Sequence, residues 1–310
     1  MNLTIIPFFL AAQLGLPEVE KWKYGAEINY HVHILSTLLN DGDENRTGMD
    51  LNGDMGCRPK DIDTLVCRIT SATMRNIGIG EDSSETDDMG GGQVFEIDFD
   101  ERGVKSLTIQ SSIPMEYLQM IRSFTAQMNV GTDIRRHVGL SSSFVRKENF
   151  TLGECSTAFN VSWEEQNSVS SEETSDDRDD SDARYDPNEV RLTLIGVPKK
   201  SGDVDLVIEK FRNPKRCTHA DKYLFWFSRN SGDFDVITSF SRIAVKENEA
   251  FESSTVTTVK MKLRKPTTLH EFVKIKLKSI AEATGPLPTI SRPAITSLSP
   301  GHNLETNFAE

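Results

Sequence analysis

The chain has 310 residues, of which 37% are hydrophobic and 26% charged, a composition that supports a folded protein with a sizeable core. Its formal net charge of −12 argues against a protein that binds nucleic acid or an anionic membrane through bulk electrostatics. Residues 191–310 carry 19 basic and 13 acidic side chains, whereas residues 1–190 carry 16 and 34. This asymmetry predicts an acidic part and a basic edge.

The amino-terminal residues form an uncharged apolar run, MNLTIIPFFLAAQLGL. The run is too short to cross a bilayer and lies where the apolar region of a secretory signal belongs. We therefore predict a signal peptide over residues 1–15 and a secreted, extracellular protein. The competing interpretation is a buried first strand. No later segment is long and apolar enough to predict a transmembrane helix.

Cysteines and asparagines support an extracellular location. The four cysteines form an even set without the C-x-x-C spacing of zinc or thioredoxin-like sites, which favours two disulfides. Three Asn-x-Ser/Thr triplets predict N-glycosylation of the surface. The residues concerned are Cys57, Cys67, Cys155 and Cys217, with Asn45, Asn149 and Asn160.

From Trp22 onward, apolar and polar residues alternate with a period of two, and β-branched residues are frequent, so the chain is predicted to be mainly strands. So many strands predict an antiparallel β-barrel or sandwich. The predicted strands are residues 26–34, 64–76, 94–100, 104–109, 143–151, 158–163, 190–195, 204–210, 223–229, 234–245 and 254–265.

One helix is predicted over residues 114–130. Pro114 suits its first turn and Gly131 its end, while Tyr117, Ile121 and Phe124 belong to an apolar stripe that should be buried. We expect this helix to pack inside the mouth of the barrel.

Two acidic stretches, residues 77–92 and 164–188, are predicted to be disordered surface insertions because they contain almost no apolar side chains. The second stretch places several serines among acidic residues, where phosphorylation by an acid-directed kinase is one reading and an unmodified acidic loop is the other. The phosphorylation candidates are Ser170, Ser171, Ser175 and Ser181. Residues 285–310 are rich in Pro, Ser and Thr and are predicted to be a linker or a truncated tail.

The order of strands and the cysteine positions resemble the amino-terminal barrel domain of vitellogenins, members of the large lipid transfer protein family. The opening strand from Trp22 to Tyr30 and the hairpin that contains Gly103 are similar to family segments. The most specific match is the family pattern E-x-x-x-x-G-x-C-x-x-x-Y, which this chain fills with Glu148, Gly153, Cys155 and Phe159.

The resemblance implies a barrel domain over residues 16–284 with one packed helix and the disordered insertions. It also implies a disulfide between Cys155 and the cysteine that follows the family's lysine run, here Lys210 to Cys217. Cys57 and Cys67 are then left to pair with each other. Vitellogenins continue into a helical domain and lipid-enclosing sheets with no counterpart in this chain, which leaves a fragment, a truncated gene model or a short relative as alternatives.

The sequence offers little for catalysis, so we expect no enzyme activity and no cofactor. None of the six histidines has a helical metal spacing or a recognisable nucleophile partner. His31 and His33 lie two apart on one strand, where a solvated face is favoured over a metal site or a pH response. Residues 50–54 imitate half of a calcium loop, but Met55 replaces the needed glycine, so an acidic turn and no metal are expected.

Basic residues alternate along the predicted strand 254–265 and along a next strand around residues 273–278, opposite apolar faces. Such rows suit contact with an acidic receptor module or a sulfated glycan, while the alternative is a charged face that only prevents edge aggregation. The resemblance implies a lipoprotein-receptor-like endocytic receptor as partner. The candidate contacts are Lys260, Lys262, Arg264, Lys274, Lys276 and Lys278.

The sequence therefore predicts the receptor-interaction domain of a lipid-transport or yolk-type lipoprotein, with lipid bound in a longer native form. The alternative is a short secreted binding module that recognises glycans, pathogen surfaces or extracellular partners. A third class, an acid-rich nutrient reservoir, is compatible with the serine-rich insertion. Nucleic acid is not expected as a partner.

Overall fold

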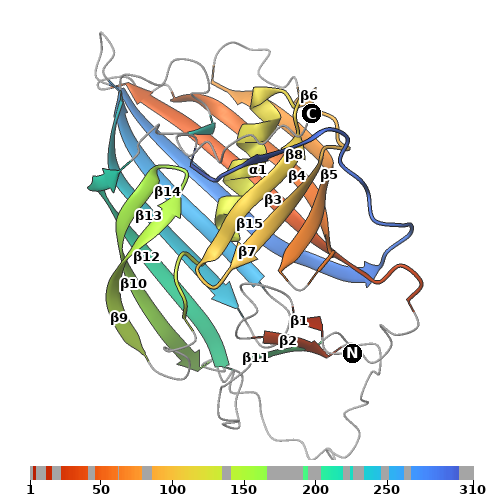
Figure 1. The fold of residues 1–310 in the computed structure, drawn as a ribbon. Helices are drawn as coiled ribbons and strands as arrows, with labels where there is room; N and C mark the ends of the chain where they lie inside the picture. The colour runs from red at the N-terminus through yellow and green to blue at the C-terminus, as the bar shows by residue number, and fades with distance from the viewer. Residues whose placement is uncertain are drawn as a thin grey trace, which may run out of the picture.

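The computed structural model describes residues 3–4, 12–15, 22–40, 46–61, 63–78, 86–134, 141–165, 191–194, 204–218, 224–225, 234–245, 251–261 and 267–299. The described residues form a large antiparallel sheet, one helix and a small separate sheet (Figure 1). The small sheet contains β1 (Leu3–Thr4), β2 (Ala12–Gly15) and β11 (Arg191–Leu194). The signal peptide over residues 1–15 stays a prediction.

In the large sheet, neighbouring strands follow one continuous path, and a short extra strand, β6 (Thr86–Asp88), pairs with β5. The path runs through β16 (Pro293–Thr296), β8 (Gly103–Gln110), β7 (Val94–Asp100), β5 (Thr64–Ile77), β4 (Arg46–Pro59), β3 (Ala26–Asn40), β15 (Thr267–Glu282), β14 (Phe251–Met261), β13 (Phe234–Val245), β12 (Val204–Thr218), β10 (Gly153–Glu165) and β9 (Ser142–Phe150). The predicted mainly β, antiparallel fold class is confirmed.

The period-two alternation of the sequence sets the two faces of the sheet. In β14, every second residue from Phe251 to Met261 is buried and the residues between them are partly or fully exposed. Three of the inward residues are the small and polar Ser253, Thr255 and Thr257. Because small side chains leave space on the inner face, a helix can approach this strand closely.

The helix α1 (Met115–Gln127) occupies that space. It contacts β14 and β15 on one side and β8 on the other, and these strands lie far apart in the sheet, so the sheet must curve around the helix (Figure 1). Residues 119–127 are all buried, with Ile121 and Phe124 in the main core cluster. The helix begins one residue after Pro114 and is shorter at its carboxyl end than predicted.

The curved sheet does not close into the predicted barrel. Among the described residues, β16 and β9 are edge strands that do not pair with each other. The chain that leaves the helix passes between the ends of β8 and β9. There the Asn129 side chain accepts a hydrogen bond from Val104 N over 3.0 Å and donates one to Asn149 O over 2.8 Å. One side chain thus bridges the two strands where a closed barrel would have backbone pairing.

Two segments predicted to be irregular are in fact ordered. Residues 293–296 form β16 on the edge of β8, and Arg122 of the helix donates hydrogen bonds to Ser297 O and Thr296 Oγ1 over 3.0 and 2.7 Å. The prediction of a linker is therefore wrong for residues 285–299, because the buried Arg122 needs acceptors that this segment supplies. Residues 300–310 lie outside the described part.

Residues 86–92, expected to belong to a disordered insertion, return to β5 instead. β6 pairs with β5, and Gly92 N donates to Ile69 O over 2.7 Å. Backbone hydrogen bonds compensate here for the scarcity of apolar side chains. Residues 79–85 of this insertion, residues 166–188 of the second one and most of the predicted strand 223–229 lie outside the described residues. No helix among the described residues is long and apolar enough to cross a membrane.

Candidate functional site

A buried ionic group lies near the end of α1, on the inner face of the neighbouring strands β9, β10, β12 and β13. Its centre is Glu148 on β9, whose carboxylate accepts hydrogen bonds from Lys210 Nζ over 2.7 Å and from Arg212 Nε and Nη2 over 2.9 and 3.0 Å. Lys210 Nζ also donates to Asn129 O over 2.6 Å. We call Asn129, Glu148, Lys210 and Arg212 the closure cluster, because Asn129 is the residue that bridges the open edges of the sheet.

Burial and charge oppose each other in this cluster. Burial raises the pKa of the Glu148 carboxyl, but the adjacent Arg212 and Lys210 lower it more, so its pKa lies below the ordinary range. Burial lowers the pKa of the Lys210 ammonium to about 8, although Glu148 acts in the opposite direction. The lowered pKa keeps the Glu148 carboxyl ionised at neutral pH beside the two basic side chains. Paired buried charges of this kind depend on one another for stability.

Hydrogen bonds extend the cluster into the helix. Arg212 Nη1 donates to Ser241 Oγ over 2.7 Å, Ser241 Oγ lies 2.6 Å from Thr255 Oγ1, and Thr255 Oγ1 donates to Gln127 Oε1 over 2.9 Å. The Arg212 guanidinium also lies 3.5 Å from the centre of the Phe150 ring. All of these side chains are buried, so the arrangement holds the sheet and helix together and offers no surface to a ligand.

Several residues of the family-like motifs belong to the closure cluster or lie next to it. Glu148 and Lys210 form an ion pair, and the cysteines near them form the Cys155–Cys217 disulfide with a Cα–Cα distance of 3.9 Å. Gly103 has a φ of +131°, and a Cβ atom there would lie 2.2 Å from Asn129 Oδ1. Sequence reasoning found Glu148, Lys210 and Gly103 through the motifs, but it missed the other members.

The second predicted disulfide also forms. Cys57 and Cys67 face each other on β4 and β5, with a Cα–Cα distance of 4.0 Å. The described part of the chain contains no free cysteine.

The outer face of β3, β4, β5 and β15 carries a charged group that the sequence only partly predicted. His33 Nε2 and Arg75 Nη2 lie 2.8 and 3.0 Å from the carboxylate of Asp50. His31 Nδ1 and Lys278 Nζ lie 3.3 and 3.0 Å from the carboxylate of Asp54. The predicted acidic turn at residues 50–54 is wrong, because these residues alternate along β4 and pair with neighbouring strands.

The lysines of β15 border this group. Burial raises the pKa of Asp54, but the hydrogen bonds and charges of Lys278 and His31 lower it overall. Lys274 Nζ lies 2.8 Å from Glu252 Oε1, and Lys276 is exposed opposite His31. The predicted lysine row therefore exists, but acidic partners are interleaved with it. Among the described residues, no group of three or more His, Cys, Asp or Glu side chains is placed to hold a metal ion.

The two predicted basic rows do not form one patch. Lys260 is opposite Thr268, whereas Lys274 is opposite Ser254, so about six residues, or roughly 20 Å of strand, separate Lys260 from Lys274. The antiparallel register places them at opposite ends of the β14–β15 pair. Lys262 and Arg264 lie outside the described residues.

The structure describes two of the three predicted glycosylation sites. Asn149 and Asn160 lie on the outer face of β9 and β10, and Asn160 Oδ1 accepts a hydrogen bond from Ser143 Oγ over 2.8 Å. Their glycosylation stays a prediction. Asn45 lies outside the described residues, as do the four phosphorylation candidates Ser170, Ser171, Ser175 and Ser181.

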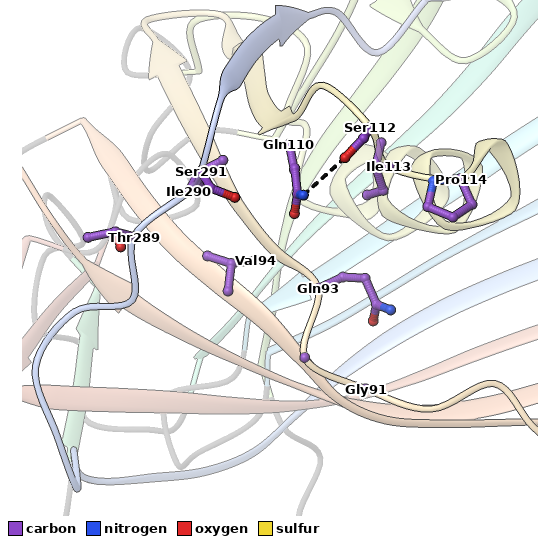
Figure 2. A pocket seen from close by; sticks show the side chains of 11 residues that line it. Gly91, Gln93, Val94, Gln110, Ser112, Ile113, Pro114, Thr289, Ile290 and Ser291 are labelled. Atoms are coloured by element: carbon purple, nitrogen blue, oxygen red, sulfur yellow. Dashed lines mark hydrogen bonds between the residues drawn. The ribbon is translucent and has the colours of Figure 1, made fainter.

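An open cavity of about 430 Å³ lies between the start of β7, the end of β8 and the segment before β16 (Figure 2). Its polar lining is neutral and its other walls are apolar, with Gln110 donating to Ser112 Oγ over 3.0 Å. The polar side chains are those of Gln93, Gln110, Ser112, Thr289 and Ser291. A smaller cavity of about 100 Å³ lies beside Arg58.

Comparison with known proteins supports the fold. No protein-family model and no curated protein sequence matches the chain. A solved structure described as "Lipid-protein interactions in lipovitellin" is similar over 87% of this chain, with a TM-score of 0.53 and 10% sequence identity. The chain spans 27% of the length of that lipovitellin chain. At this identity the likeness establishes a shared fold.

Proposed function

We propose that this chain is a secreted interaction domain of a lipid-transport or yolk-type protein, and that it acts by recognition rather than by catalysis. The observation that carries the proposal is the likeness of its curved sheet and central helix to the lipovitellin fold, a fold solved in a study of lipid–protein interactions. The two disulfides support an extracellular location, because such bonds persist in oxidising compartments.

The recognition surface in this proposal is the lysine row of β15. Lys274 and Lys278 hold acidic partners at 2.8 and 3.0 Å, and Lys276 lies between them and is exposed. A lipoprotein-receptor module presents an acidic cage that can compete for such lysines. Exposed ion pairs are weak, so exchanging an internal partner for a receptor carboxylate costs little.

The test measures binding of the full-length protein to a recombinant calcium-loaded, cysteine-rich lipoprotein-receptor module. The test variant combines Lys274→Gln, Lys276→Gln and Lys278→Gln, and its control combines Lys105→Gln and Lys147→Gln with Lys215→Gln. Both variants lose three positive charges, so long-range attraction changes equally. We expect the test variant alone to lose binding at least about tenfold, the effect of removing roughly 1.4 kcal/mol. Equal effects of the two variants would refute a specific lysine contact.

A secreted module that recognises glycans, pathogen surfaces or other extracellular partners is the second candidate. The cavity in Figure 2 favours it, because neutral amide and hydroxyl side chains beside apolar walls suit a hydroxylated ligand. Binding to a panel of neutral oligosaccharides or to heparin, without binding to the receptor module, would favour this function. The nutrient-reservoir role depends on phosphorylated serines outside the described residues and stays a prediction.

A further inference from the structure

Apolar side chains form a continuous row across the outer face of the large sheet. In each pair of neighbouring strands from β9 to β3, an outward apolar residue is directly opposite the next one. With strands about 4.8 Å apart, seven strands extend the row over roughly 29 Å. We call it the apolar row, and its members are Val145, Ala158, Phe211, Phe240, Val256, Phe272 and Leu35.

Solvent reaches this row most at the β9 end. Val145 is 58% exposed, Phe211 47% and Val256 40%, whereas Phe272 and Leu35 at the other end are less exposed. Ile237, in a bulge of β13 near the row, is 50% exposed. Four of the seven exposed large hydrophobic residues of the described chain therefore lie in or beside the row. Scattered exposed apolar residues are common, but seven in register form a contiguous surface.

The outward side chains that border the apolar row are polar and carry almost no net charge. On one side, outward Thr238, Thr258, His270 and Thr37 follow the same register. On the other side, Glu209 is directly opposite Arg242. Farther along the same face, Lys274 and Lys147 are paired with Glu252 and Glu154 over 2.8 and 3.3 Å. The apolar row itself carries no charge, and opposite charges are placed next to one another beside it, so the row does not require an anionic lipid.

The exposed apolar area of the row is too small for a stable interface with a second copy of the chain. The exposed parts of Val145, Phe211, Ile237 and Val256 amount to roughly 300 Å², since each such side chain offers on the order of 150–200 Å². A stable interface between two proteins buries about 800 Å² on each partner. Two outwardly curved sheets would also touch over a small part of the row.

We propose that the apolar row at the β9 to β14 end docks on the surface of a zwitterionic phospholipid layer. Phenylalanine and aliphatic side chains enter the boundary between head groups and acyl chains, and threonine hydroxyls beside them contact the head groups. A neutral surface of this kind matches the internally paired charges. The inference deepens the proposed lipid-related function and rests on it, since that function brings the chain to lipid.

The test measures flotation of the full-length protein with phosphatidylcholine vesicles after enzymatic removal of N-glycans. Glycans are removed because Asn160 is two residues from Ala158 on the same face. The test variant is Phe211→Ser with Phe240→Ser. Its control is Met115→Ser with Ile295→Thr, two residues that are 50% and 54% exposed away from the row. Thermal unfolding of each variant verifies that it is folded.

We expect the test variant to bind vesicles about tenfold or more weakly than the unsubstituted protein, and the control to bind equally well, at both low and high salt. Equal binding by the test variant would overturn the proposal. So would a failure of the unsubstituted protein to float. Light scattering that shows a dimer dissociated by Phe211→Ser and Phe240→Ser would assign the row to self-association instead. If the native product carries lipid while the test variant still floats, only this inference fails and the proposed function stands.

Discussion

Replacing Glu148 by glutamine removes a carboxylate that neutralises two buried cations. Lys210 and Arg212 are buried beside it at 2.7 to 3.0 Å, and glutamine keeps the shape of the side chain without its charge. Breaking a buried ion pair in this way costs about 3–5 kcal/mol. Lys210 can lose its proton, because burial already lowers its pKa to about 8, whereas a guanidinium group does not deprotonate in proteins. Most of the loss should therefore come from Arg212.

The assay is urea unfolding of Glu148→Gln at pH 7 with both disulfides intact. Lys147→Gln is a matched control, because this neighbouring residue is 70% exposed and its ion pair with Glu154 should contribute no more than about 1 kcal/mol. We expect Glu148→Gln to lose a large share of the free energy of unfolding and Lys147→Gln to lose almost none. A loss below about 1 kcal/mol for Glu148→Gln would refute the role of the closure cluster.

A comparison of the unsubstituted protein with Glu148→Gln also tests how stability depends on pH. The pKa of Glu148 is lower in the folded protein than in the unfolded chain, so its charge stabilises the fold above the unfolded pKa. That contribution is lost as the pH falls through the lowered folded value. The original protein should therefore lose stability below about pH 4.5 more steeply than Glu148→Gln. Parallel acid-unfolding curves would contradict an ionised Glu148.

Three further substitutions test other parts of the fold. Replacing Cys155 and Cys217 by serine should cost about 4 kcal/mol by calorimetry, since the bond closes a 62-residue separation, and an unchanged melting temperature would contradict it. Arg122→Met should cost about 2 kcal/mol and increase amide exchange around Thr296, because two hydrogen bonds to the carboxyl-terminal segment are lost. Gly103→Ala should cost about 2 kcal/mol or more in urea unfolding, and a neutral result would refute a strained glycine there.

Strands rich in β-branched and aromatic residues were predictable from the sequence. Residues 94–100 and 234–245 form β7 and β13 with the predicted bounds. β4 was missed because its aspartates and glycines are typical of turns. In the structure, a Cβ atom at Gly53 would lie 2.5 Å from Ser71 O, so this glycine permits close approach of β5 rather than a turn.

The site residues were predictable only where a motif marked them. Glu148 and Lys210 stood in family-like motifs, but their contact depends on the register of β9, β10 and β12 across 62 residues. Asn129 was assigned to the helix, and nothing in the local sequence shows that its side chain joins two strands. The apolar row depends on the register of seven strands at once, so alternation within single strands could not reveal it.

The central claim, a lipid-type interaction domain, is tested most directly by native mass spectrometry and phospholipid analysis of the secreted product. We expect phospholipid to stay with the secreted product through purification. A lipid-free secreted glycoprotein would contradict the lipid-transport function and favour the binding module instead.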